Sequence, residues 1–163
     1  MGLQKGFQWI PLPPLVVGVI LPYLASLLDV YLPEAPFGPA RWLGVLFFLG
    51  GCLLSAASVS LIYTPGQWET TPYPRGVPKQ LVIIGPYRYV RNPMLLGILL
   101  IVLGEGFYFQ SLSILSYMAA FFIFVNLLLL PGEERRLEER FGENYLHYKE
   151  KVHRWLPTAS PYK

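Results

Sequence analysis

The stretch "WLGVLFFLGGCLLSAASVSLIY", residues 42–63, decides the fold. It carries no charged side chain, and it is as long as the roughly 20 residues with which an α-helix crosses the hydrocarbon core of a membrane. Its second half is rich in small residues, which let another membrane helix approach closely. These residues are Gly50, Gly51, Ser55, Ala56 and Ala57. The stretch predicts a membrane-spanning helix over about 41–63.

The composition of the whole chain agrees with this interpretation. The chain has 163 residues, of which 53% are hydrophobic and 14% are charged, and its mean hydropathy is +0.42. These values exclude an average soluble domain. The net charge of +3 gives no reason to expect a nucleic-acid partner, and Cys52, the single cysteine, excludes an intrachain disulfide. We therefore expect one integral membrane domain over residues 1–163.

Three further apolar segments cover about 14–31, 93–109 and 113–130. The last two are separated by so few residues that they predict a tight helical hairpin. The first lacks the small-residue cleavage pattern of a signal peptide, so we expect it to be retained as an anchor. Pro22 predicts a kink within it. The predicted fold class is therefore an all-α membrane protein with about four transmembrane helices.

The placement of lysine and arginine predicts the orientation, because cytoplasmic segments carry an excess of both. All of them except Arg41 lie before the first segment, in the loop over 64–92 or in the tail over 131–163. The sequence thus predicts a multi-pass protein with both termini, the loop and the tail in the cytoplasm. Arg88 and Arg91 are interpreted as anchors at the cytoplasmic surface.

The loop over 64–92 is rich in proline and glycine, so we expect irregular backbone in it rather than helix. Its apolar run at 81–84 is suited to lie against the helices or at the membrane surface. Asn92 and Pro93 predict the start of the next helix. Asn92 is the expected N-cap, and Pro93 fits the first helical position, where its missing N–H costs nothing.

The tail predicts an amphipathic helix, because apolar residues recur in it every three or four positions. These residues are Leu137, Phe141, Tyr145, Tyr148 and Val152. Gly142 interrupts this face and predicts a bend or two short helices. Glu133 and Glu134 stand at its start, and two interpretations are open. They complement the dipole of a helix N-terminus, or they bind a cation or an amine.

Glu105 lies about twelve residues into the third apolar segment, where an ionisable side chain is by default a functional candidate. The alternative is that Glu105 reaches the outer interface, because the segment ends shortly after it. His147 and His153 lack the spacing of metal ligands, and no nucleophile–base pair or phosphate-binding loop is visible. We therefore expect no metal site.

Two motifs carry a resemblance to a known family. They are "LVIIGPYRYVRNPMLLG", residues 81–97, and "GEERRLEERFGENYLHYKEKVHRWLP", residues 132–157, one on each side of the predicted hairpin. Together they resemble the isoprenylcysteine carboxyl methyltransferase and phospholipid methyltransferase superfamily over about 72–157. The resemblance implies an integral membrane enzyme that uses S-adenosylmethionine and methylates a lipophilic, lipid-like acceptor.

The resemblance also implies which residues bind the cofactor. They are Gln80, Leu81, Val82, Tyr87, Asn92, Pro93 and Glu133, with Glu134 adjacent. Three positions depart from the family pattern. Asn92 replaces a common histidine, Leu95 replaces a common tyrosine, and Leu129 replaces the arginine with which carboxyl methyltransferases hold their substrate.

Several functions are open at this point. Methyl transfer mainly requires that acceptor, methyl group and sulfur lie in line and that water is excluded, so a carboxylate acceptor needs no base. For an amine or a hydroxyl acceptor, Glu105 is the intramembrane candidate for a catalytic base. We expect transfer to a prenylcysteine-like carboxylate or another lipid. The alternatives are a phospholipid amine N-methyltransferase and a non-catalytic scaffold or lipid-binding relative, which Asn92 and Leu95 allow.

Overall fold

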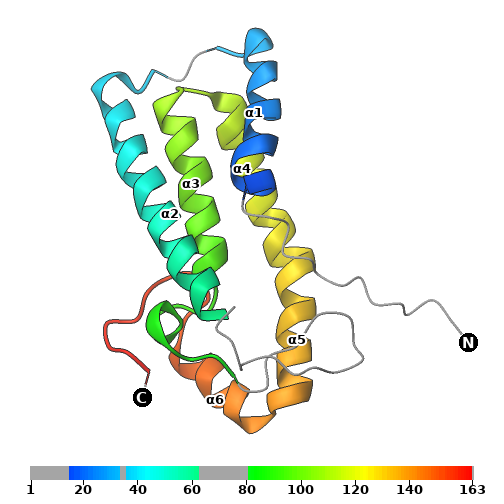
Figure 1. Ribbon diagram of the computed structural model, residues 1–163. Helices are drawn as coiled ribbons and strands as arrows, with labels where there is room; N and C mark the ends of the chain where they lie inside the picture. Colours follow the sequence, from blue (N-terminus) through cyan, green and yellow to red (C-terminus); the bar gives the residue numbers. More distant parts are fainter. Residues whose placement is uncertain (1–14, 34–35, 63–80, 163) are drawn as a thin grey trace, which may run out of the picture.

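The computed structural model describes residues 15–33, 36–62 and 81–162, and every regular element in these ranges is helical (Figure 1). The α-helices are α1 (Leu21–Ser26), α2 (Leu43–Ile62), α3 (Pro93–Tyr108), α4 (Leu112–Phe124), α5 (Leu130–Phe141) and α6 (Glu143–Lys151). The shorter helical turns are η1 (Val16–Ile20), η2 (Leu27–Tyr31), η3 (Gly38–Trp42), η4 (Gly85–Arg88) and η5 (Val125–Leu129). The predicted all-α class is confirmed for this part of the chain. Gln80 lies outside the described residues.

Two helical stretches, Gly38–Leu61 and Leu112–Phe141, are long and apolar enough to cross a membrane, with mean hydropathies of 2.0 and 2.2. Only 22% of the apolar window of each stretch is buried inside the molecule. Most of this apolar surface therefore faces outward, unlike that of a core helix in a soluble protein. Val16–Tyr31 and Pro93–Tyr108 are apolar but shorter. Four membrane spans stay a prediction.

α2 and α3 pack side by side with their backbones in contact (Figure 1). A Cβ atom placed on Gly51 would lie 2.5 Å from the carbonyl oxygen of Gly97. A Cβ atom placed on Gly104 would lie 2.5 Å from the carbonyl oxygen of Gly44. Neither distance leaves room for a carbon atom, so glycine at these positions permits the close approach of the two helices.

The small residues of α2 do not all take part in this contact. Ser55 does, because its hydroxyl donates a hydrogen bond to the Met94 carbonyl of α3 at 3.4 Å. Gly50 does not, because a Cβ atom placed on it meets nothing within 4 Å. The predicted close packing is therefore confirmed for Gly51 and Ser55 and is wrong for Gly50.

Pro22 lies at the start of α1, directly after the π-helical turn η1. Leu21 donates its N–H to the Val16 carbonyl, five residues back, and the next residue in line, Pro22, has no N–H to offer Val17. The Tyr117 hydroxyl of α4 donates to the Val17 carbonyl instead, at 2.9 Å. The interruption that Pro22 causes thus becomes a contact between α1 and α4.

α4, η5 and α5 form one continuous helical stretch, Leu112–Phe141. Leu130 donates its N–H to the Val125 carbonyl, five residues back, so the helix continues through Pro131 without a break. At 1.5 Å per residue the stretch is about 45 Å long, which exceeds the hydrocarbon core of a membrane by about 15 Å. Its charged last part, from Glu133 onward, follows the apolar part that ends at Leu130.

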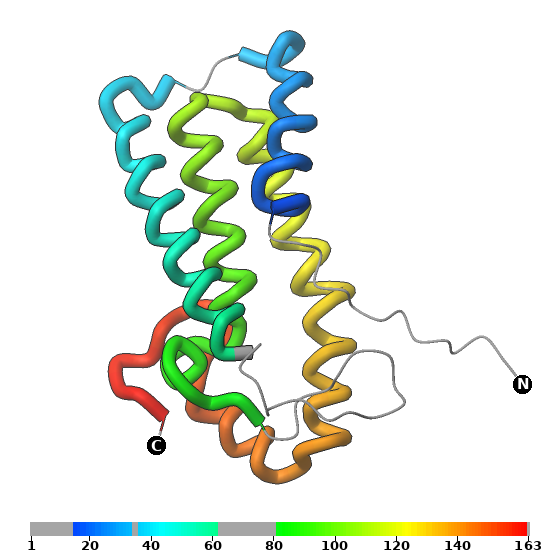
Figure 2. Tube along the Cα trace, viewed as in Figure 1, coloured from blue at the N-terminus to red at the C-terminus, as the bar shows by residue number. Residues whose placement is uncertain are grey.

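The remaining elements gather at the end of the bundle where α2 ends and α3 begins (Figure 2). We name this end the polar end; it contains η4, the start of α3, α5, α6 and residues 152–162. The hairpin between α3 and α4 lies at the opposite end. There the Ser111 side chain accepts a hydrogen bond from the Ile114 N–H at 3.0 Å and so caps α4. The predicted helical hairpin is confirmed.

Candidate functional site

The last residues of the chain run alongside the segment that precedes α3 (Figure 2). Arg91 donates its N–H to the His153 carbonyl at 2.9 Å, and Thr158 donates its N–H to the Tyr89 carbonyl at 2.9 Å. Because these two segments are far apart in the sequence, each bond fixes the position of one against the other. The tail and the segment before α3 therefore form one unit at the polar end.

An apolar cluster packs within this unit. Its buried members are Tyr145, Tyr148 and Val152, and the residues packed on them are Leu81, Ile83, Leu137, Phe141 and Tyr162. The apolar face predicted for the tail is thus confirmed, and so is the break at Gly142, whose φ of +52° separates α5 from α6. The Tyr148 hydroxyl also donates to the Tyr87 carbonyl at 2.6 Å. The 81–84 run packs on the tail, and Leu81 is engaged in this packing.

Glu134 is the centre of a group of charges that we name the Glu134 cluster: Glu134, Arg91, Lys149 and Arg154. Its Oε1 atom accepts hydrogen bonds from Arg91 Nη1 at 2.8 Å and from Arg154 Nε at 2.9 Å. Its Oε2 atom accepts from Arg154 Nη2 at 2.9 Å and lies 3.4 Å from Lys149 Nζ. The cluster ties α5 and α6 to the segment before α3 and to the tail.

The Glu134 cluster corrects the interpretation of the two arginines before α3. The side chains of Arg91 and Glu134 are only 10% and 9% exposed, so Arg91 is an internal ion-pair partner and its prediction as a surface anchor is wrong. Arg88 also faces the protein, since its Nε donates to the Tyr162 carbonyl at 2.8 Å. Both arginines hold the tail of the chain.

The two neighbouring glutamates differ in their electrostatic surroundings. Burial by itself raises the pKa of the Glu134 carboxyl, but the hydrogen bonds from Arg154 and the charges of Arg91, Arg154 and Lys149 outweigh burial, so the pKa is lower than the ordinary value of 4.5. Glu134 is therefore a carboxylate whose oxygens are already occupied by donors from the protein.

Glu133 has no such partners. Its side chain is exposed, and among the described residues no hydrogen bond or ion pair reaches its carboxylate. Although solvent reaches it, the surrounding protein and the Glu134 charge raise its pKa, while Arg136 lowers it. Burial and then the Glu133 charge raise the pKa of Tyr87. The Glu133 charge thus acts on Tyr87, and the assignment of both residues to one cofactor site stays a prediction.

The helix-dipole interpretation does not account for this pair of glutamates. The backbone stays helical from α4 through η5 into α5, so the N–H groups at the start of α5 are not those of a free helix end. Glu134 is explained by its ion pairs. The role of Glu133 as a cofactor ligand stays a prediction.

Asn92 and Pro93 lie where the sequence places them, at the start of α3. Pro93 is buried in the first turn, as predicted. Asn92 occupies the N-cap position, but its side chain makes no capping hydrogen bond, and its amide donates to the Arg154 carbonyl at 3.5 Å. The prediction of a side-chain cap is therefore wrong. Val82 is half-buried, in the same segment before α3.

Glu105 lies far along α3 from the candidate residues at the polar end. It lies twelve residues beyond Pro93 in α3, which is about 18 Å along the helix at 1.5 Å per residue. Its side chain is buried, with a residue exposure of 9%, and its Oε2 atom has no hydrogen-bond partner. Burial excludes the alternative that Glu105 reaches the interface.

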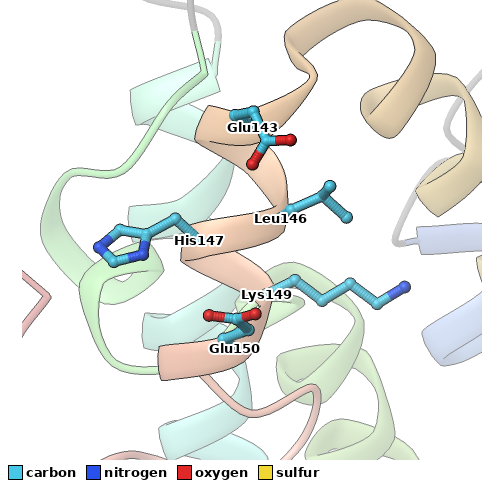
Figure 3. Close-up of a pocket in the computed structure, with 5 residues that line it drawn as sticks. All are labelled: Glu143, Leu146, His147, Lys149 and Glu150. Carbon is cyan, nitrogen blue, oxygen red and sulfur yellow. The ribbon is translucent and has the colours of Figure 1, made fainter.

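A surface pocket lies along α6 (Figure 3). This pocket has a volume of about 330 Å³, and its lining residues are Glu143, Leu146, His147, Lys149 and Glu150. Figure 3 shows these side chains spread along one helix rather than converging on a point. No group of three or more potential metal ligands occurs within the described ranges. The pocket contains none of the candidate cofactor residues.

The sequence analysis missed Arg154 and Lys149 as parts of the site. Both side chains pair with Glu134, which lies 15 positions before Lys149 and 20 positions before Arg154, so no local pattern marks them. It also missed Asn126 in η5, which accepts a hydrogen bond from Trp155 Nε1 at 3.0 Å. A polar residue within an apolar helix was the available signal for Asn126.

The fold and the site together define an all-helical, membrane-associated protein with a charged site at one end. The chain belongs to the phospholipid methyltransferase family, whose sequence profile matches residues 39–144, well over half of its length. The match includes α2, α3, α4, α5, Tyr87 and both glutamates. The resemblance stated from the two motifs is thereby confirmed, and the chain is placed among membrane methyltransferases.

The chain is similar to two bacterial proteins. The chain is 29% identical over 136 residues to the cobalt-zinc-cadmium resistance protein CzcN of Cupriavidus metallidurans. This alignment covers 78% of the chain and 58% of CzcN. It is also 35% identical over 63 residues to an uncharacterised protein of Haemophilus influenzae. That alignment covers 39% of the chain and the whole of the other protein. The chain thus spans less than two thirds of the length of CzcN.

Proposed function

We propose that the protein is an S-adenosylmethionine-dependent methyltransferase that transfers a methyl group to a lipid-like acceptor at the polar end. The observation that supports this proposal best is Glu133, an exposed carboxylate that no hydrogen bond or ion pair from the described residues reaches and whose charge acts on Tyr87. It stands next to a second carboxylate, Glu134, that the protein holds rigidly. The family assignment supplies the reaction class.

The donors and acceptors at the polar end fit this cofactor. Bound there, the cofactor supplies an activated methyl group on a positively charged sulfur. Glu133 can accept hydrogen bonds from an amino group or from ribose hydroxyls, and a carboxylate makes such bonds strong. The backbone N–H groups at the start of α3 suit the cofactor's own carboxylate. Tyr87 offers an aromatic face to the sulfonium or to the adenine.

The residues of this site act mainly by position. Asn92 and Pro93 set the start of α3, and Tyr87 is held by the Tyr148 hydroxyl on its carbonyl oxygen. Alignment of the acceptor with the methyl group and exclusion of water are then the main requirements for transfer. We further propose four membrane spans with the polar end in the cytoplasm, so that a lipophilic acceptor arrives from the membrane side.

One observation favours an amine acceptor as the second candidate function. Arg88, Arg91 and Arg154 each donate to oxygens of the protein itself, as shown by the bonds of 2.8 to 2.9 Å described above. Leu129 stands where carboxyl methyltransferases carry an arginine. A carboxylate acceptor would thus find few uncommitted cations among these residues, whereas an amine would find Glu133. Phospholipid amine N-methylation is therefore the alternative to test.

The first test is cofactor binding. Calorimetry of the protein in detergent is expected to show binding of S-adenosylhomocysteine, the cofactor product, and Glu133→Gln should weaken it by about tenfold or more because a charge-assisted bond is lost. Glu139→Gln is the matched control, because Glu139 pairs with Arg135 on an exposed face. Absence of binding by the wild-type protein would refute the proposal.

The second test identifies the acceptor. Membrane lipids extracted from the host are incubated with the protein and with cofactor labelled in the methyl group, and the lipids are separated by headgroup. Label in the amine phospholipids supports N-methylation, and label released by mild base supports a methyl ester. Binding without label in any lipid would assign the protein to the non-catalytic class.

A further inference from the structure

We infer that Glu134 is a positioning residue rather than a cofactor ligand, and that it acts through Arg91 and Arg154 to hold Glu133 and Tyr87 in place. This inference rests on the proposed function, because it concerns the same site. It separates two adjacent glutamates that share one motif. Glu133 faces the cofactor, and Glu134 fixes the geometry in which Glu133 can do so.

The first step of the argument is that Glu134 has little capacity left for a ligand. Each of its oxygens accepts at least one guanidinium hydrogen bond of 2.8 to 2.9 Å, and Lys149 Nζ lies 3.4 Å from Oε2. Its side chain is 9% exposed. A cofactor that bound Glu134 would have to displace charged donors from a buried carboxylate, which is costly.

The second step concerns the helix that carries both glutamates. Successive residues of an α-helix point about 100° apart, since one turn takes 3.6 residues. Arg91 and Arg154 hold the Glu134 side chain, and these bonds tie α5 to the segment before α3 and to the tail. Glu134 is therefore buried in the cluster, whereas Glu133, one residue before it on the same helix, points away from it and is exposed.

The third step concerns the segment that carries Tyr87. Arg91 lies four residues after Tyr87, and its backbone N–H is bonded to His153 while its side chain is bonded to Glu134. Arg154 follows His153 directly, and its carbonyl accepts the Asn92 amide. One carboxylate thus joins α5, the Tyr87 segment and the tail. Without it, α5 loses its side-chain bonds to Arg91 of the Tyr87 segment and to Arg154 of the tail.

The test is a double-mutant cycle on Arg91 and Glu134, read as the affinity for S-adenosylhomocysteine by calorimetry in detergent. The variants are Arg91→Met, Glu134→Leu and both together. Replacing both members of a buried ion pair by apolar residues of similar volume is often neutral for stability. Lys149 keeps Glu138 at 2.6 Å, and the Arg154 side chain is 31% exposed, so water can solvate it. The double variant should therefore keep a thermal midpoint near that of the wild type.

We expect affinity to fall by about 10- to 100-fold in Glu134→Leu and in the double variant alike, because a displacement of about 1 Å at a binding site has effects of this size. Losses that add in the double variant would show that Glu134 contacts the cofactor itself and would overturn the inference. Wild-type affinity in a stable double variant would overturn it too, whereas a wild-type protein that does not bind refutes the proposed function instead.

A second pair of variants decides the question if the double variant does not fold. Arg154→Gln removes the two hydrogen bonds to Glu134, and Arg154→Lys keeps the charge while losing the planar pair of donors. We expect Gln to weaken S-adenosylhomocysteine binding more than Lys does. Arg135→Gln, which breaks the exposed pair with Glu139, is the matched control and should leave affinity unchanged. Equal affinity in all three variants would overturn the inference.

Discussion

The α2–α3 contact and the Glu134 cluster both fix α3, the first through shape and the second through charge. In the α2–α3 contact, Gly51 faces Gly97 and Gly44 faces Gly104 at distances that exclude a side chain. In the Glu134 cluster, three cationic side chains from separate segments meet at one carboxylate. The first contact lies along the apolar length of α3, and the second lies just before its start.

The two contacts respond to different disturbances. A contact made by shape is broken by any added atom and is indifferent to pH, because no group in it titrates. A contact made by charge tolerates a change of shape in part, but it fails when one partner is removed or protonated. The predicted site lies beside the charge-based contact. Its geometry is therefore expected to depend on protonation, whereas the bundle that carries it does not.

The largest effect is expected for Gly97→Leu. A side chain at this position would overlap the Ser55 side chain, the Gly51 carbonyl oxygen at 2.8 Å and the Ser55 nitrogen at 2.8 Å, so α2 and α3 must separate. Overpacking against rigid neighbours costs about 1–3 kcal/mol per small addition, and we expect a loss of at least about 3 kcal/mol for leucine. Thermal unfolding in detergent measures it.

Gly50→Leu is the matched control for this prediction. A Cβ atom at Gly50 meets nothing within 4 Å, although Gly50 is the neighbour of Gly51 in the same helix. Because glycine is a poor helix former, the leucine variant is expected to be as stable as the wild type or more stable by up to about 1 kcal/mol. Equal destabilisation by both variants would show that shape does not govern the contact.

The next effect is a loss of stability in acid that depends on Glu134. Its pKa in the folded protein is below the ordinary value of 4.5, so the unfolded chain takes up the proton first as the pH falls. The stability that Glu134 contributes is therefore complete above 4.5 and is lost as the pH falls through its folded pKa. The charges around it are Arg91, Arg154 and Lys149, with Glu133 as its neighbour.

Glu133 affects the pH dependence of stability in the opposite direction. Its folded pKa is raised, so the folded protein holds the proton more tightly, and stability falls as the pH rises from 4.5 through the folded pKa. Thermal midpoints between about pH 3 and pH 7 are expected to flatten below 4.5 in Glu134→Gln and to flatten above 4.5 in Glu133→Gln. Identical profiles in the two variants would contradict the distinction between the glutamates.

The sequence predicted the helices well because their signal is local. The apolar runs at 41–63 and 93–109 correspond to α2 and α3 within about two residues, apart from the extra turn η3 before α2. The break at Gly142 was also predicted, since glycine interrupts an otherwise regular face. In each case the deciding residues lie within one or two helical turns of each other.

The site was predicted only in part because its contacts are not local. Tyr87 and Glu133 were assigned together through the two motifs, and their common role in a cofactor site stays a prediction. Arg91 and Glu134 are separated by 43 positions, and nothing in the sequence shows that they meet. Nor does it distinguish Glu133 from Glu134, because the partners that bury Glu134 lie at distant positions in the sequence.

The smallest effect is expected for Glu105→Gln. This variant tests whether α3 depends on charge in the part that the α2–α3 contact holds by shape. Glu105 is a buried carboxylate in the part of α3 that packing alone holds, and its Oε2 atom has no partner to lose. We expect stability to change by less than about 1 kcal/mol, whereas Tyr117→Phe, which removes the bond to Val17, should cost about 0.5–1.5 kcal/mol.

Methyl transfer by Glu105→Gln, measured with the labelled cofactor, is expected to equal that of the wild type, because about 18 Å of helix separates Glu105 from the start of α3. Loss of transfer with unchanged S-adenosylhomocysteine affinity would lead to a different conclusion. It would show that Glu105 acts on the acceptor as a base. The reacting group of the acceptor would then have to lie deep in the bundle, and the cofactor site proposed around Glu133 would have to extend along α3 toward the hairpin.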